Sequence, residues 1–160
     1  MKELKLPSEL AQQIDRLCKQ GDDLMDTGDY LKAAQKYIDA LRLLPRPIEQ
    51  WEVTPHLAFF WGLAYFKAKK WDTAVNSFAS ALAYASHADD PNVHLHIGMA
   101  YHNDHKPRKG KMHLSKAFEL GGCEVFHGVE DVYLEIATSN PTETKKIVRP
   151  AKSGSHKKGI

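Results

Sequence analysis

Small and large apolar residues recur along the chain at fixed spacing. Three glycines are each followed 19 residues later by an alanine: Gly21 and Ala40, Gly62 and Ala81, Gly98 and Ala117. A large apolar side chain precedes each alanine by three residues: Tyr37, Phe78 and Leu114. Small residues let two helices cross closely, and large ones fill the space between neighbouring pairs. The pattern therefore predicts three pairs of antiparallel helices.

One such pair cannot bury its apolar face alone, so successive pairs are expected to stack. The pattern places the pairs at about residues 14–47, 55–88 and 91–124. A unit of this length with these positions resembles the tetratricopeptide repeat (TPR). The resemblance implies an all-α, TPR-like right-handed superhelix of three helix pairs. The third unit matches less well, because Gly110 stands where the family usually has alanine and Lys106-Pro107 occupies the turn.

An insert of seven residues separates the first two units and contains Trp51. Two arrangements of this insert are open. In one, Thr54 caps the next helix and Pro55 lies in its first turn. In the other, a longer helix begins at Ile48 and kinks at Pro55. In both, the large indole of Trp51 is expected to find a surface to pack against.

The C-terminal part changes character after Gly121-Gly122, which is expected to end a helix. Apolar residues then recur at helical spacing and predict a capping helix at about residues 128–138 that covers the last repeat. We interpret residues 1–138 as the TPR domain and residues 139–160 as a basic flexible tail.

Four segments, taken in order, resemble a small bacterial TPR family. They are LLPRPIEQWE, WGLAYFKAKKWDTAVNSFASAL, DDPNVHLHIGMAYH and EVFHGVEDVYL, within residues 11–137. The family shares a Leu-Pro-x-Pro-x-x-x-Trp-Glu insert. Some of its members resemble genes found beside secreted or polymorphic toxins, so the resemblance implies a link to toxins.

Composition fits one packed domain, since 42% of the 160 residues are hydrophobic and 26% are charged. No run of 18 apolar residues is present, and the N-terminal segment lacks the apolar stretch of a secretion signal. Cys18 and Cys123 are too few for a disulfide framework. We therefore expect a cytoplasmic protein without a membrane association.

The net charge of +2 is unevenly distributed. The tail from residue 139 onward carries six basic residues and one acidic residue, which leaves a charge of −3 on the other 138 residues. The tail also lacks interleaved aromatic residues. We therefore do not expect nucleic acid as a partner of the folded part.

The first helix of each TPR unit usually lines a concave face. In this chain the corresponding positions are acidic in the first unit, mostly apolar in the second and mixed in the third. The candidate groove consists of Asp15, Asp22, Met25, Asp26, Phe59, Leu63, Phe66, Lys67, Leu95, Met99 and His102. An apolar groove with a charged rim suits a partner helix or an extended peptide. The alternative is that Phe59, Leu63 and Leu95 pack inside the superhelix.

One familiar TPR role, the clamping of a C-terminal carboxylate by co-chaperones, is not expected. That role uses Lys, Asn, Asn, Lys and Arg, in this order, at five positions. The corresponding residues are Cys18, Asp22, Phe60, Asn92 and His96, none of which matches. Asp22 would repel the carboxylate of the peptide.

Little in the sequence points to catalysis or metal binding. Six of the nine histidines lie between His87 and His113, but no His-x-x-x-His pair places two ligands on one helix face. Phosphate loops, Cys-x-x-Cys pairs and nucleophile elbows are missing from the sequence. The acidic neighbours of Cys18 are expected to raise the pKa of its thiol. We expect no enzyme activity, no metal and no cofactor.

The favoured interpretation is a non-catalytic module that binds a protein partner, and in its sharpest form a bacterial toxin-immunity protein. The acidic Asp15, Asp22 and Asp26 would then face a basic toxin. A chaperone of secreted proteins, similar to those of type III translocators, is the alternative, although those lack the Trp51 insert. A homodimer anchored by Trp51 and a regulator that binds metal through its histidines also stay open.

Overall fold

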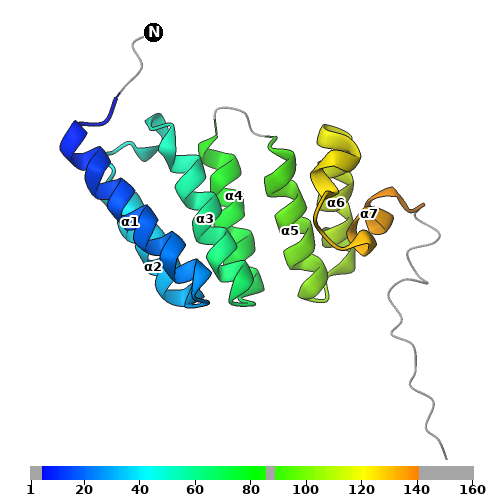
Figure 1. The fold of residues 1–160 in the computed structure, drawn as a ribbon. Coiled ribbons are helices and arrows are strands. Elements are labelled where there is room, and N and C mark those ends of the chain that lie inside the picture. The colour runs from blue at the N-terminus through cyan, green and yellow to red at the C-terminus, as the bar shows by residue number, and fades with distance from the viewer. Residues whose placement is uncertain (1–4, 86–88, 141–160) are drawn as a thin grey trace, which may run out of the picture.

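Helices form the regular structure of the chain in the computed structural model, which describes residues 5–85 and 89–140 (Figure 1). The α-helices are α1 (Ser8–Asp26), α2 (Tyr30–Leu43), α3 (Val53–Lys67), α4 (Trp71–Tyr84), α5 (Pro91–Asn103), α6 (Pro107–Gly121) and α7 (Asp131–Thr138). Two short 3-10 helices, η1 (Ile48–Gln50) and η2 (Gly122–Phe126), precede α3 and follow α6.

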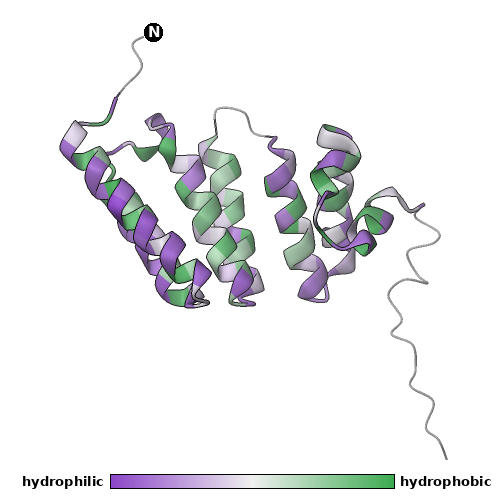
Figure 2. Cartoon of the chain, in the orientation of Figure 1, coloured by the Kyte–Doolittle hydropathy of each residue, from purple (hydrophilic) through white to green (hydrophobic). Residues whose placement is uncertain are grey.

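The helices pack in the order of the chain, each mainly against the one before and the one after. Figure 1 shows a row of pairs from α1 and α2 to α5 and α6, with α7 at the C-terminal end. The all-α architecture of three helix pairs and a C-terminal helix is therefore confirmed. In Figure 2 the hydrophobic colour is most continuous on α3 and α4, the central pair.

Close helix crossings explain the glycine pattern. A Cβ atom on Gly21 would lie 2.8 Å from the ring of Tyr37, and one on Gly98 would lie 2.6 Å from the Cγ atom of Leu114. Real Cβ atoms essentially never approach other atoms this closely. Each glycine therefore makes room for the large residue that the sequence places 16 residues later.

Gly110, which departs from the TPR pattern, lies where α6 crosses α5. A Cβ atom at this position would lie 3.1 Å from the backbone oxygen of Gly98 and 3.1 Å from the backbone nitrogen of His102. Backbone atoms inside a helix have little freedom to move aside. The glycine therefore permits a closer crossing than the alanine that usually stands here.

The insert follows neither arrangement completely, although Pro55 does lie in the first turn of α3. The η1 turn is separate from α3, and α3 begins at Val53, so Thr54 does not cap the helix. Instead the buried hydroxyl of Thr54 donates a hydrogen bond of 2.6 Å to the carbonyl oxygen of Ile48. Trp51 is only 6% exposed, and its indole Nε1 donates to the carbonyl oxygen of Pro45 at 2.7 Å. The surface that receives Trp51 is thus its own chain, and Trp51 is not exposed as an anchor for a dimer.

The C-terminal segment folds back onto the third pair. Helix α6 ends at Gly121, and Gly122 follows in the left-handed conformation with φ of +63°, as expected. Helix α7 packs mainly on α6, and η2 contacts both α5 and α6. Most of the basic tail, residues 141–160, lies outside the described residues. Within residues 5–85 and 89–140, no helix combines the length and apolar character needed to cross a membrane.

Candidate functional site

The candidate groove residues fall into three groups by exposure. Four are exposed: Asp15, Asp22, Asp26 and Lys67. Five are half-buried: Met25, Phe59, Leu63, Phe66 and His102. Two are buried: Leu95, at 2% exposure, and Met99, at 9%. The acidic and central parts of the expected groove are therefore accessible, while the apolar part on α5 is not.

Leu95 and Met99 are buried because the C-terminal segment covers them. They belong to one apolar cluster with Phe126 of η2 and with Tyr133 and Ile136 of α7. This differs from the expectation that both residues line an open groove. In the third unit the chain itself occupies the face on which a partner was expected.

The second unit keeps the equivalent positions partly open. Phe59 and Leu63 stand where Leu95 and Met99 stand one unit later. Both lie against the central apolar cluster but remain half-buried. Their neighbour Phe60 is 41% exposed, one of the largest exposed apolar side chains among the described residues.

Four rings connect the three units across this face, and we call them the aromatic row: Tyr37, Phe60, Phe59 and His96. Tyr37 of α2 stacks on Phe60 of α3, with ring centroids 5.8 Å apart. Phe60 meets Phe59 edge-on at 5.8 Å, and Phe59 meets His96 of α5 edge-on at 5.1 Å. The row therefore runs from the first helix pair to the third.

The aromatic row reaches the acidic end of the expected groove. The Tyr37 hydroxyl donates a hydrogen bond of 2.6 Å to the carboxylate of Asp22 on α1. Burial of the side chain is the largest cause that raises the pKa of Tyr37, and this hydrogen bond is the next largest. Burial also raises the pKa of the Cys18 thiol, and Asp22 and Asp15 add to the effect. The expected direction for Cys18 is confirmed, although burial contributes more than the acids, and the reactive thiolate is disfavoured.

His96 behaves as an aromatic member of this surface rather than as a cation. Its Nδ1 lies 2.7 Å from the backbone oxygen of Asn92, and its ring also packs against Phe78 at 5.5 Å. Burial lowers the pKa of His96 below its ordinary value. The ring is therefore neutral at neutral pH.

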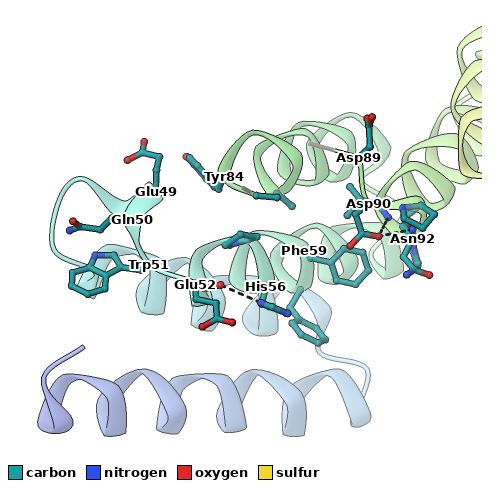
Figure 3. Close-up of a pocket in the computed structure, with 17 residues that line it drawn as sticks. Glu49, Gln50, Trp51, Glu52, His56, Phe59, Tyr84, Asp89, Asp90 and Asn92 are labelled. Atoms are coloured by element: carbon teal, nitrogen blue, oxygen red, sulfur yellow. Dashed lines mark hydrogen bonds between the residues drawn. The ribbon is translucent and has the colours of Figure 1, made fainter. Parts of the chain in front are cut away.

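A cavity of about 1030 Å³ opens beside the aromatic row, and three of the four rings, Phe60, Phe59 and His96, line it (Figure 3). Four segments line it: the insert, the first turns of α3, the end of α4 and the beginning of α5. The lining residues are Glu49, Gln50, Trp51, Glu52, Pro55, His56, Phe59, Phe60, Ala81, Tyr84, Ala85, Asp89, Asp90, Pro91, Asn92, Val93 and His96. We call this cavity the insert pocket.

Acidic residues stand at both ends of the insert pocket. In Figure 3, Glu49 and Glu52 lie on the side of the insert, and Asp89 and Asp90 lie on the side of α5. Phe59 and Tyr84 lie between the two ends. Among the described residues that line the pocket, none is lysine or arginine. The pocket therefore combines an aromatic middle with an acidic rim.

The four carboxylates differ in how they are engaged. Asp90 caps α5 by accepting hydrogen bonds from the backbone N–H groups of Asn92, at 2.8 Å, and Val93, at 3.4 Å. Asp89 lies 3.6 Å from His94 Nε2 and 3.9 Å from Lys116 Nζ. By contrast, neither Glu49 nor Glu52 forms an ion pair within the described part of the chain.

The pocket walls were not expected from the sequence. The groove positions come from the repeat register, whereas Glu49 and Glu52 belong to an insert outside that register. Glu49 and Asp89 are 40 residues apart and line the same pocket only because the α3–α4 pair turns back on itself. The one available signal was the pair Asp89-Asp90 beside the start of the third unit.

The histidine cluster forms a pair rather than a larger centre. The Nδ1 atoms of His94 and His113 lie 3.0 Å apart, so one hydrogen bond between the two imidazole rings connects α5 and α6. His102, another clustered histidine, meets Tyr133 edge-on at 5.6 Å. In residues 5–85 and 89–140, no group of three or more side chains is arranged to hold a metal. His87 lies outside the described residues.

Comparison with solved structures identifies the type of fold. No protein family and no curated protein matches the chain by sequence. The structure is similar to the first TPR of Spaghetti (RPAP3) bound to the HSP90 peptide SRMEEVD, with a TM-score of 0.60 and 20% identity over 79% of this chain and 95% of that chain. The fold is a TPR-like superhelix.

Two further solved structures agree with this fold. The Sgt2 TPR domain from Aspergillus fumigatus has a TM-score of 0.59 and 20% identity, covering 92% of this chain and 86% of that chain. The MamA RS-1 ArsTM double mutant has a TM-score of 0.57 and 20% identity, covering 88% and 78%. At this level of identity the likeness establishes the shared fold alone.

Proposed function

We propose that the chain is a non-catalytic module that binds a helix or peptide of a partner protein on the face formed by α1, α3 and the beginning of α5. The observation that carries this proposal is a difference in exposure between equivalent positions of the second and third units. Leu95 and Met99 are covered by the C-terminal segment, whereas Phe59 and Leu63 remain half-buried and Phe60 is 41% exposed. Partly exposed aromatic side chains next to charged residues are typical of binding surfaces.

A peptide partner fits the fold, because the Spaghetti domain is described with a bound HSP90 peptide. The peptide chemistry would differ here. The sequence SRMEEVD carries three acidic side chains, and in this chain Asp22 and the acidic rim of the insert pocket would repel such a ligand. We therefore propose a partner that is not acidic.

In its finer form the proposal is a cytoplasmic immunity protein of the bacterial TPR family described above. The exposed Asp15, Asp22 and Asp26 would face a basic toxin. The second candidate is a chaperone of secreted proteins, favoured by the compact arrangement of three helix pairs. A protein that self-associates without using Trp51 is the third.

Site-specific photo-crosslinking tests the binding face without knowledge of the partner. A photoreactive phenylalanine derivative replaces Phe60 on the proposed face. Leu31 on α2, which is 54% exposed, provides a matched control position. Each variant is irradiated in extract from the source cells, and the products are identified by mass spectrometry.

We expect one partner to crosslink at position 60 and not at position 31. Products that are the same at both positions, or no product at position 60, would contradict the proposal.

Co-expression with the captured partner then distinguishes an immunity protein from a chaperone. An immunity protein protects cells that express the captured partner, whereas a chaperone raises the amount of soluble partner without protecting against toxicity.

A further inference from the structure

We propose that the insert pocket receives a basic segment of the partner, one that carries lysine or arginine side chains beside apolar ones. This inference rests on the proposed function and gives the partner's chemistry. It also places the main contact at the junction of the insert with α3, α4 and α5, not along the acidic face of α1.

The size of the insert pocket suits a peptide segment. Small-molecule pockets are usually about 300–1,000 Å³, and this cavity, at about 1030 Å³, reaches the upper end of that range. Its walls come from three helices and a turn, and it is open to solvent. A single side chain would leave most of this space filled with water.

The negative charge of the rim favours an occupant with positive charge. Four carboxylates line the pocket, and among its described lining residues only His56 and His96 are able to become cationic. Burial lowers the pKa of His96, which removes one of these two at neutral pH.

Helix dipoles do not cancel the negative charge around the cavity. Helices α3 and α5 begin at the pocket and α4 ends there. Each helix start contributes about +0.5 charge and each helix end about −0.5. Together with four carboxylates, these contributions leave about −3.5 charges around the cavity.

The aromatic middle of the pocket adds a second reason for a cationic segment. Phe59, Phe60 and Tyr84 line the pocket, and Figure 3 shows Phe59 and Tyr84 between the two acidic ends. Aromatic faces attract lysine and arginine side chains, and they also bury the apolar stems of these side chains. A segment with basic residues near both ends and apolar residues between them would match the rim and the middle together.

A metal ion does not explain the same carboxylates. Glu49 and Glu52 lie on the opposite side of the pocket from Asp89 and Asp90 (Figure 3). Among the described residues no three potential ligands converge. The charges are therefore spread as they would be for several cations along a chain.

Fluorescence anisotropy with designed peptides tests this inference on the full chain. The first probe is an amphipathic peptide of about 16 residues, made of lysine and leucine. The second replaces each lysine with glutamate, and the third replaces each leucine with serine. A fourth probe is the peptide of residues 141–160, the chain's own basic tail.

Two charge-reversed variants locate the binding. Glu49→Lys with Glu52→Lys reverses the free acids of the pocket. Glu119→Lys with Glu135→Lys is the matched control, because it changes the net charge equally at exposed acids of α6 and α7 that lie outside both the pocket and the proposed binding face. Circular dichroism verifies that both variants fold.

We expect the lysine–leucine peptide to bind at least about tenfold more tightly than the other two designed probes. The pocket variant should weaken this binding about tenfold, and the control variant less than about twofold. Equal loss in both variants, or loss only in the control variant, would overturn the pocket assignment and leave the proposed function standing. Tighter binding of the 141–160 peptide would identify the tail as the occupant and overturn the inference. Failure of crosslinking at position 60 would instead count against the proposed function itself.

Discussion

A Cβ atom on Gly62 would lie 2.6 Å from the Cδ1 atom of Phe78. This is the crossing of α3 and α4, the central pair of the superhelix. The Phe78 ring is fully buried and packs against both Phe59 and His96. The ring therefore has no room to retreat, and the same contact that holds the central pair together also supports the proposed binding face.

We expect Gly62→Ala to lower the free energy of unfolding by about 2 kcal/mol, since overpacking a core costs about 1–3 kcal/mol. The clash must outweigh the gain in helix propensity, which is about 1 kcal/mol for this exchange. Urea unfolding followed by circular dichroism measures the change. Asn76→Ala, on the exposed side of α4, is the control and should change stability by less than about 0.5 kcal/mol. An equally or more stable Gly62→Ala variant would show that the crossing adapts.

The repeat pattern was predictable because it is local. The pairs Gly21 with Tyr37 and Gly62 with Phe78 each lie within one unit, so their spacing along the chain reports a contact in space. The insert was less predictable. Its turn is held by hydrogen bonds from Trp51 and Thr54 to backbone oxygens six residues earlier. Neither hydrogen bond belongs to the repeat pattern, so the spacing of the repeats does not predict it.

Leu95 and Phe60 should respond differently to truncation, because the C-terminal segment covers Leu95 alone. Leu95 is 2% exposed beneath the C-terminal segment, whereas Phe60 is 41% exposed. We expect Leu95→Ala to cost about 2–5 kcal/mol of stability and Phe60→Ala clearly less. Thermal unfolding of both variants provides the measurement. Similar costs for the two would mean that the C-terminal segment does not cover α5 in solution.

The Thr54 hydroxyl holds the insert against α3, so its loss should be visible in stability. Thr54→Val keeps the shape of the side chain but removes the hydrogen bond to the carbonyl oxygen of Ile48. A buried acceptor left without its donor costs about 1–3 kcal/mol. The control is Thr73→Val, at an exposed position of α4, which should be nearly neutral. Chemical unfolding compares the two variants, and equal effects would argue against the Thr54 bond.

Trp51 should matter for stability and not for self-association. Trp51→Phe removes the indole hydrogen bond to Pro45 and is expected to cost about 1 kcal/mol. Because the side chain is only 6% exposed, the sedimentation coefficients of the parent and the variant should agree at each of two protein concentrations. A dimer that dissociates in the variant would restore Trp51 as an interface residue.

The candidate site shows where prediction from sequence stops. Phe59 and the acids of α1 follow the repeat register, and the structure leaves them accessible. The burial of Leu95 depends on Phe126, Tyr133 and Ile136, which lie more than 30 residues later. The sequence predicts that a C-terminal helix covers the last repeat, but it does not show that this helix reaches the groove positions of α5. Tertiary packing of a segment outside the repeats decided which positions stay open.

Stability should fall as the pH drops from about 7 to about 5, because buried histidines resist protonation. Burial lowers the pKa of His96, and burial and then the charge of His94 lower the pKa of His113. In the unfolded chain a histidine titrates near pH 6.5. Below that pH the unfolded state therefore binds protons that the folded state does not, and the free energy of unfolding decreases. Above about pH 7 both states are neutral at these residues, so their contribution is constant.

His96→Leu isolates one part of this effect. The groups that face His96 are the rings of Phe59, Phe66 and Phe78, with the charges of Lys67 and Asp90 nearby. Leucine fills an apolar site of this kind and has no proton to bind. The variant is compared with the parent by the difference between the free energies of unfolding at pH 7 and pH 5, so that a change in stability common to both pH values cancels. We expect this difference to be smaller in the variant. An unchanged difference would mean that His96 is protonated as readily in the folded chain as in the unfolded one, and that the ring is far more accessible to water than its place between α3, α4 and α5 implies.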